Sequence, residues 1–466
     1  MFLNDRRPAA RALILWSMLT ALLAASILFI FLHWGGAGFK IFLQQWPLED
    51  LRITLASVTF AWLLLGALIY LLYARRVNAR NAWGIAGFFL IGFIYLNLLS
   101  ERFRYGDYQY YLEAASNLLQ HKPLPPTYLY PPLWATLLQF LVPSGEENSL
   151  LILWAANFIS LMAFYVLLQR VLEHYGFSTR LAALVTTLFM LINAPVLRTL
   201  FYVQINLHTL NFILLSLLLY PKRPFLSALA LALAVHLKSS PIVLALAFLL
   251  ELDWRWLGWF VVSLVLVAMF TVAIDGIYPF LDFIKTTQGL TALQTTNFHD
   301  TSFDSFFRSI VPLLHLDLIW ASVLTYASKA LLLTAALLVT LRAAGRAIFF
   351  DGKGKGARLA NALPPLFILM TLASPVVWEH HGIFVALSFL LLLKRLETPD
   401  EWIWFGLAYI LEFILPTFDF LPWSYGRLLA PLIVLWLIWR ATGKQGRSRI
   451  FASLNDWMDK LPALGI

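Results

Sequence analysis

The chain has 466 residues, of which 61% are apolar and only 13% carry a charge. A water-facing surface normally needs about 25% charged residues, so this composition excludes an ordinary soluble protein and indicates a membrane protein. The formal net charge is +9, but the basic residues lie in short clusters between apolar segments, which argues against a nucleic-acid-binding protein.

Apolar segments of transmembrane length recur along the chain. A helix needs roughly 20 residues to cross the hydrocarbon layer. Six segments come close to that length, namely residues 12–32, 53–73, 83–99, 150–168, 257–273 and 318–341. With the shorter apolar segments between and after them, the sequence predicts an all-α polytopic membrane protein with about 13 transmembrane helices. The first segment has no small-residue cleavage site behind it, so we expect it to remain as a helix.

Clusters of Lys and Arg predict the orientation of these helices, because short cytoplasmic loops carry an excess of both residues. The clusters lie at residues 6–11, 75–80, 222–223, 342–358, 394–395 and 440–449. Placing them in the cytoplasm leaves both termini inside. The outer loops are then residues 34–52, 100–149, 197–204, 237–240, 274–316, 373–382 and 419–427.

Two segments decide whether this orientation is consistent. Residues 132–142 are too short to cross, so we expect a helix on or in the outer leaflet. Residues 225–250 are long enough for one span, but Pro241 would break a continuous helix, which favours a hairpin with its tip outside. Reversing either interpretation alone would move every later loop to the opposite side of the membrane. The later Lys and Arg clusters would then lie outside, against the positive-inside rule.

Unusual polar side chains gather in the outer loops, and Asp107 is the most informative of them. A carboxylate held beside a bilayer is costly unless it pairs with another group or performs chemistry. The other members of this outer set are Arg102, Arg104, Arg198, Gln204, Asn206, His208, His236, Lys238, Asn297, His299, Asp300, Asp304, Arg308 and the run Ser374-Pro-Val-Val-Trp-Glu-His-His381. We expect one external site, although arginines also bind lipid headgroups and single amides often join helices.

The sequence offers no pattern typical of a metal site. Cysteine is absent, and no His-x-x-x-His or Glu-x-x-His pair occurs. The adjacent His380 and His381 would point about 100° apart on a helix, so we expect no metal and no cofactor. Lys329 and Glu412 lie near the middle of apolar segments, where a lone charge is costly, and we expect them to form an ion pair whose role is structural.

Several motifs resemble a known family of membrane enzymes. The runs Gly106-Asp-Tyr-Gln-Tyr-Tyr and Tyr130-Pro-Pro-Leu, followed by Gln204-Ile-Asn206, Lys238-Ser-Ser-Pro241 and the run ending at His381, resemble motifs of glycosyltransferase family 87 in the expected order. The resemblance covers roughly residues 83–440. Two departures stand out: three helices rather than one precede Asp107, and residues 297–302 match the family's Asn-Gln-Ser only loosely.

The resemblance implies a GT-C superfamily bundle that transfers a sugar, typically mannose, from a polyprenyl phosphate donor on the non-cytoplasmic face. Asp107 is at the position of the expected general base, and a single carboxylate predicts inversion at the anomeric carbon. Candidates for binding the donor phosphate or sugar are Lys238, Arg198, His381, His380, Gln204, Asn206, Arg104 and Arg308. Candidates on the acceptor side or in supporting loops are Tyr105, Tyr130, Trp378 and Asn297.

The expected organisation has three parts: two extra N-terminal transmembrane helices in residues 1–81, a catalytic membrane domain in residues 82–440, and a cytoplasmic tail in residues 441–466. The expected partners are the lipid-linked donor, a glycolipid or glycan acceptor and membrane lipids, with no nucleic acid. The expected location is the bacterial inner membrane, as a multi-pass protein whose site faces outside. A multispan transporter, a lipid-linked glycan flippase or polymerase, and a noncatalytic scaffold subunit remain as alternatives.

Overall fold

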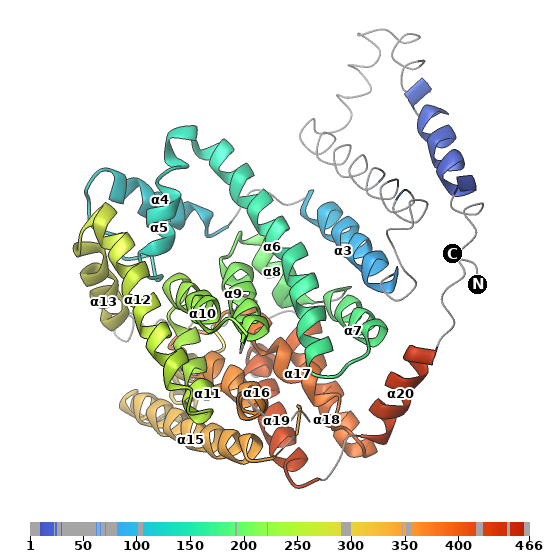
Figure 1. The fold of residues 1–466 in the computed structure, drawn as a ribbon. Helices are drawn as coiled ribbons and strands as arrows, with labels where there is room; N and C mark the ends of the chain where they lie inside the picture. The colour runs from blue at the N-terminus through green and yellow to red at the C-terminus, as the bar shows by residue number, and fades with distance from the viewer. Residues whose placement is uncertain are drawn as a thin grey trace. The chain divides into compact units, whose positions relative to one another are not determined.

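The structure is a computed structural model (Figure 1). It describes residues 10–22, 82–100, 106–191, 193–220, 222–289, 300–346, 348–350, 356–415, 423–444 and 448–460, with a few single positions between 24 and 70. Within these ranges the regular elements are all helical, and one isolated β-bridge joins Asp300 to Trp378. The predicted all-α class is therefore confirmed for the described residues, whereas the apolar segment 53–73 lies outside them, apart from single positions.

The helices follow one another in chain order from α3. They are α3 (Ala82–Ser100), α4 (Tyr108–Leu119), α5 (Leu133–Leu138), α6 (Glu146–His174), α7 (Thr179–Leu191), α8 (Ala194–Phe201), α9 (Asn206–Leu219), α10 (Pro224–Leu237), α11 (Ala245–Leu250), α12 (Trp254–Asp275), α13 (Tyr278–Gly289), α14 (Phe303–Ile310), α15 (Ile319–Ala344), α16 (Ala357–Leu372), α17 (Ala386–Leu392), α18 (Pro399–Tyr409), α19 (Gly426–Ala441) and α20 (Arg449–Lys460). The 3-10 turns are Val142–Ser144, Ser240–Leu244, Pro312–Leu314, Glu379–Val385 and Trp423–Tyr425, and Ile410–Ile414 forms a π-helical turn.

Three described helices are long and apolar enough to cross a membrane by themselves: Asn148–His174, Trp254–Asp275 and Ile319–Ala344. They coincide with three of the predicted spans. Shorter apolar helices include α9, α10 and α16, which have 14, 14 and 16 residues. Apolar helices of these lengths are consistent with a multi-pass membrane protein, and the total of about 13 spans stays a prediction.

The two ambiguous segments are both interrupted, as the sequence predicts. Helix α5 has only 6 residues and is too short to cross a bilayer. Helix α10 ends at Leu237, Lys238 has an extended backbone, and Pro241 lies inside the 3-10 turn that follows. Because proline cannot donate the backbone hydrogen bond of a helix interior, the break occurs at this point.

Contacts within the chain divide it into two compact units. The first comprises residues 1–105, 177–191 and 455–466. In it α3 packs on α7, and the Tyr95 hydroxyl donates a hydrogen bond of 2.7 Å to the Met190 carbonyl. The second comprises residues 106–176 and 192–454 and contains most of the predicted site residues. The predicted domain limits at 81 and 440 remain predictions.

In the second unit, helix ends rather than helix middles surround the site. Helix α10 lies between α9 and α12 (Figure 1) and packs against both. Helix α16 is buried along almost its whole length, as expected for a helix that is apolar on all sides. The starts of α4 and α9, the end of α10 and the turn Glu379–Val385 all carry predicted site residues or adjoin them.

The expected ion pair between Lys329 and Glu412 is wrong. The charges that act on Lys329 are those of Asp304 and Asp300, since α14 packs beside α15. Glu412 instead lies beside Arg427 at the start of α19, and its backbone carbonyl accepts a hydrogen bond of 3.1 Å from Arg427 Nε. Each of the two side chains meets charges from the helix that packs beside its own: α14 beside α15, and α19 beside the turn Ile410–Ile414.

Candidate functional site

Asp107 is held in place by a close contact between two backbone segments. Its N–H donates a hydrogen bond of 2.9 Å to the carbonyl of Tyr202, in the turn after α8. A Cβ atom on the preceding Gly106 would lie 2.8 Å from the same carbonyl oxygen. Only glycine allows this approach without displacing the backbone, so Gly106 fixes the start of α4 against the turn.

The Asp107 carboxylate is not used to cap its own helix. Asp107 is the N-cap residue of α4, but its side chain makes no capping hydrogen bond. It accepts a hydrogen bond from Gln204 Nε2 instead. Burial raises the pKa of Asp107 to about 6, while Gln204 and the positive charge of Lys238 act in the opposite direction. A carboxylate with a pKa close to neutral is well suited to accept a proton in a reaction.

Gln204 connects Asp107 to two tyrosines. It is fully buried, and its Oε1 accepts hydrogen bonds from the hydroxyls of Tyr111, at 3.0 Å, and Tyr130, at 2.9 Å. The preceding residue, Val203, has a φ of +53°, which is rare for a β-branched residue. Strained backbone of this kind persists where its surroundings fix it, and such sites are often functional.

Lys238 places a positive charge near Asp107. Its Nζ donates a hydrogen bond of 2.9 Å to Asn206 Oδ1 and lies 6.0 Å from the Tyr130 ring centroid and 5.2 Å from that of Phe384. Burial lowers the pKa of Lys238 to about 7, and the negative charge of Asp107 opposes that shift. The side chain therefore titrates near neutral pH, as a lysine desolvated by aromatic groups is expected to do.

A cavity of about 130 Å³ lies against Lys238. Its wall combines hydroxyl, cationic and aromatic groups, which is typical of a small-ligand site. The polar and aromatic residues that line it include Tyr130, Lys238, Ser239, Ser374, Trp378 and His381. The structure thus brings the Lys-x-x-Pro segment, the Tyr130 loop and the segment 374–381 to one hollow.

The segment 374–381 is held in place by hydrogen bonds to Asp300 and within itself. Asp300 accepts hydrogen bonds from the Val377 N–H, at 2.9 Å, and from the N–H and hydroxyl of Ser302, both at 3.0 Å. The Trp378 N–H donates to His381 Nδ1 at 3.2 Å, which leaves the ring proton of a neutral His381 on Nε2. Trp378 and His381 are therefore held at defined positions in the cavity wall.

His380 and Arg198 have other neighbours. The His380 carbonyl accepts a hydrogen bond of 3.3 Å from Asn206 Nδ2, which ties the turn Glu379–Val385 to the start of α9. Glu379 lies between two arginines, 3.2 Å from Arg198 and 3.0 Å from Arg427. The charge of Arg198 is thus already matched by a carboxylate, unlike that of Lys238, whose hydrogen-bond partner is a neutral amide.

Other predicted site residues, Asp107 among them, do not line the cavity. Arg308 forms an ion pair of 2.9 Å with Asp304 on its own helix, α14. Arg104, Tyr105 and Asn297 lie outside the described residues. Among the residues that the structure describes, no group of three or more His, Asp and Glu side chains is arranged to hold a metal ion.

Three residues take part in the site without having had an individual predicted role. Tyr111 is the buried partner of Gln204, whereas Glu379 and Arg427 form the ion cluster beside His380. Tyr111 lies in the same aromatic loop as Asp107, so its proximity could have been suspected. Arg427, a lone cation at the start of the last long apolar segment, was the available signal for the ion cluster.

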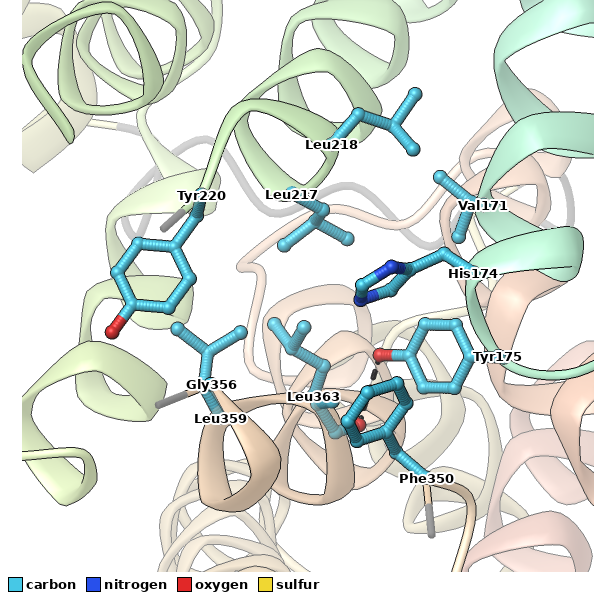
Figure 2. Close-up of a pocket in the computed structure, with 11 residues that line it drawn as sticks. Val171, His174, Tyr175, Leu217, Leu218, Tyr220, Phe350, Gly356, Leu359 and Leu363 are labelled. Atoms are coloured by element: carbon cyan, nitrogen blue, oxygen red, sulfur yellow. Dashed lines mark hydrogen bonds between the residues drawn. The ribbon is translucent and has the colours of Figure 1, made fainter. Parts of the chain in front are cut away.

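Two further hollows are lined by other residues. One lies between α6, α9 and α16 and has a volume of about 40 Å³. The residues that line it, drawn in Figure 2, include four leucines and His174, which stacks on Phe350. The other is an apolar groove of about 500 Å³ between α15 and α19, with Phe303 of α14 in its wall. Its remaining wall is formed by side chains such as Leu332, Ala335, Leu435 and Trp436. Neither hollow contains a predicted site residue.

Comparison with known proteins gives one match. The family model described as glycosyltransferase family 87 matches residues 128–375, which is 248 of the 466 residues. The match includes Tyr130, Gln204, Asn206 and Lys238, begins after Asp107, and ends before His381. No curated protein and no solved structure matches the chain significantly.

Proposed function

Since the chain belongs to glycosyltransferase family 87, we propose that it transfers a hexose, typically mannose, from a polyprenyl phosphate donor to an acceptor hydroxyl on the non-cytoplasmic face of the membrane. The family and the apolar helices make it a membrane glycosyltransferase. The observation that carries the finer proposal is that Lys238, which lines a polar cavity, is close enough for its positive charge to act on the Asp107 carboxylate.

The proposed reaction needs a base and a stabilised leaving group. Asp107 takes the proton of the acceptor hydroxyl while that oxygen forms a bond to the anomeric carbon. The bond from the anomeric carbon to the phosphate oxygen breaks, and its electron pair leaves with the polyprenyl phosphate. The Lys238 ammonium stabilises the charge that develops on that phosphate. One displacement from the opposite side inverts the configuration at the anomeric carbon.

The cavity wall supports a sugar as the transferred group. Tyr130 and Trp378 supply aromatic faces, and Ser239, Ser374 and His381 supply hydrogen-bonding groups. A sugar ring presents apolar C–H faces and a rim of hydroxyls, and this combination of side chains is suited to both. Asn206 then supports the site indirectly, because it holds Lys238.

The groove between α15 and α19 suits the isoprenoid tail of the donor. Its lining is almost wholly apolar, and Leu331 and Leu338 in its wall are 71% and 54% exposed, so it opens on the lipid side of these helices. Phe303 in the groove lies three residues after Asp300, whose backbone pairs with that of Trp378 in the cavity wall. The tail can therefore stay in lipid while the phosphate and sugar enter the cavity.

A product assay tests the proposed function. Purified protein in lipid vesicles is incubated with polyprenyl-phosphate-mannose and a lipid extract from its host membrane. The expected result is a new mannosylated product whose anomeric configuration is opposite to that of the donor. Movement of donor across the vesicle membrane without a new glycosidic bond would contradict the proposal and favour a transporter.

A further inference from the structure

Gln204 is the link between Asp107 and the aromatic cluster of the outer loop. We propose that Tyr111 and Tyr130 are positioning residues that hold the Gln204 amide in the one orientation that stabilises the ionised carboxylate of Asp107. This inference rests on the proposed role of Asp107 as the base. It adds Tyr111 to the site and gives the hydroxyl of Tyr130 a second role, because both hydroxyls act on the base through the Gln204 side chain.

The hydrogen bonds around Gln204 define that orientation. An amide can turn either its NH₂ group or its carbonyl oxygen toward a carboxylate, and only the NH₂ group attracts the ionised form. The hydroxyls of Tyr111 and Tyr130 both donate to Oε1, at 3.0 and 2.9 Å. A carbonyl oxygen has two lone pairs, so these two donors occupy it and direct Nε2 to Asp107 Oδ2.

Turning the amide over would be unfavourable in this environment. The NH₂ group would then face the two hydroxyl oxygens, which would have to accept instead of donate. Tyr111 is fully buried, and besides Gln204 the two hydroxyls have each other as hydrogen-bond neighbours, so only one of them could donate to the other. At least one hydroxyl proton would lose its acceptor, and an unsatisfied buried donor is costly.

The consequence concerns the proton on Asp107. A protonated carboxyl is stabilised when it donates to a carbonyl oxygen, but Oε1 of Gln204 is already occupied by the tyrosines. Protonation therefore weakens the hydrogen bond from Nε2, because a neutral carboxyl is a poorer acceptor than a carboxylate, and gains no acceptor for the new proton, which favours the ionised base. Among titratable groups in the described part of the chain, Lys238 acts on Asp107, and the negative charge of Asp107 in turn acts on Tyr111 and Tyr130.

The tyrosine hydroxyls are themselves fixed by ring packing. The Tyr111 ring lies edge-on to Tyr130, at 5.3 Å between centroids, and to Trp134, at 6.4 Å. A change of tyrosine to phenylalanine keeps these ring contacts and the contact of Tyr130 with Lys238, and removes only the hydroxyl. The cluster also provides a matched control. Tyr128 packs against the same rings, but its hydroxyl donates to the Pro131 carbonyl at 3.1 Å.

The experiment is the pH dependence of kcat/KM for Tyr111→Phe, Tyr130→Phe and the double variant, with polyprenyl-phosphate-mannose as donor. The acid limb of the profile, the rise of kcat/KM at low pH, follows the pKa of Asp107. In the double variant we expect this limb to move up by roughly one pH unit, because the freed amide can turn its oxygen toward Asp107 and stabilise the protonated carboxyl. The basic limb should stay in place, since the ring beside Lys238 is kept. The Tyr128→Phe variant should leave both limbs unchanged.

Two results would overturn the inference: an acid limb that does not move in the double variant, or an equal shift in Tyr128→Phe. If the double variant is folded but inactive, titration of the Asp107 carboxyl by difference infrared spectroscopy, with Asp107→Asn as the blank, measures the same shift. Failure of the proposed function looks different, because the parent protein itself would then form no mannosylated product, and an active Asp107→Asn variant would remove the proposed base whatever the tyrosine variants do.

Discussion

At the residue scale, the proposed chemistry depends on Asp107 as the base and on Lys238 as the group that stabilises the leaving phosphate. Burial raises the pKa of the carboxyl to about 6 and lowers that of the ammonium group to about 7. The proposed reaction needs the carboxyl ionised and the ammonium group protonated. Asp107 is in its active form above its pKa, and Lys238 is in its active form below its own.

The pH dependence of kcat/KM follows from those two conditions. Activity should rise with pH through about 6, where Asp107 loses its proton, and fall through about 7, where Lys238 loses its own. Because kcat/KM reports the free enzyme, the two limbs belong to the unliganded site. Steady-state rates at subsaturating donor between pH 5 and pH 9 check this. A profile that is flat across that range would contradict both assignments.

At the scale of single elements, the start of α4 depends on one glycine. A Cβ on Gly106 would meet the Tyr202 carbonyl, so Gly106→Ala should displace the backbone that carries Asp107. Forcing an extra methyl group into a packed site typically costs about 1–3 kcal/mol, and we expect a lower midpoint of thermal unfolding in detergent. Gly258→Ala in α12 is the control, since nothing lies within 4 Å of its Cβ. An equal unfolding temperature for both variants would refute the close contact.

The groove between α15 and α19 gives a prediction about donor length. Ala335→Trp should fill the groove and raise the KM for a long-chain donor several-fold, because the isoprenoid tail loses its apolar binding surface. A donor with only one or two isoprene units should be used as well as by the parent protein. Val261→Trp, on an exposed face of α12, is the control for a tryptophan placed in lipid. Equal effects on long and short donors would exclude the groove as the tail site.

The positions of the helix breaks could be predicted from the local sequence. Pro241 marked the end of α10, and the short segment 132–142 contained only the 6-residue helix α5, because both features depend on local chemistry. The partner of Glu412 could not be predicted in this way. Its neighbour Arg427 comes from another helix, and which charges meet is decided by packing.

The same limit applies to the candidate site. The outer position of Asp107, Gln204 and Lys238 in the sequence, and the order of their motifs, indicated that they belong together. The ion cluster around Glu379 was not foreseen, since Arg198 and Arg427 approach it from distant parts of the chain. By contrast, Arg308 and Asp304 are four residues apart on one helix, a spacing from which their pairing could have been anticipated.

At the scale of the whole molecule, the charge clusters predict which loops face each side of the membrane. The absence of cysteine allows a direct test with single cysteines, Lys122→Cys and Lys222→Cys, both at exposed positions. A membrane-impermeant maleimide should label position 122 in intact spheroplasts and position 222 only after permeabilisation. The reverse pattern would place Asp107 on the cytoplasmic side.

The most direct test of the central claim compares Asp107→Asn with the parent protein for donor binding and for sugar transfer. The substitution keeps the shape of the side chain but removes the base. Loss of a general base typically costs about 100-fold to 10,000-fold in rate, so we expect turnover to fall by that factor while the Kd for polyprenyl-phosphate-mannose changes little. Turnover close to that of the parent protein would contradict the assignment of Asp107.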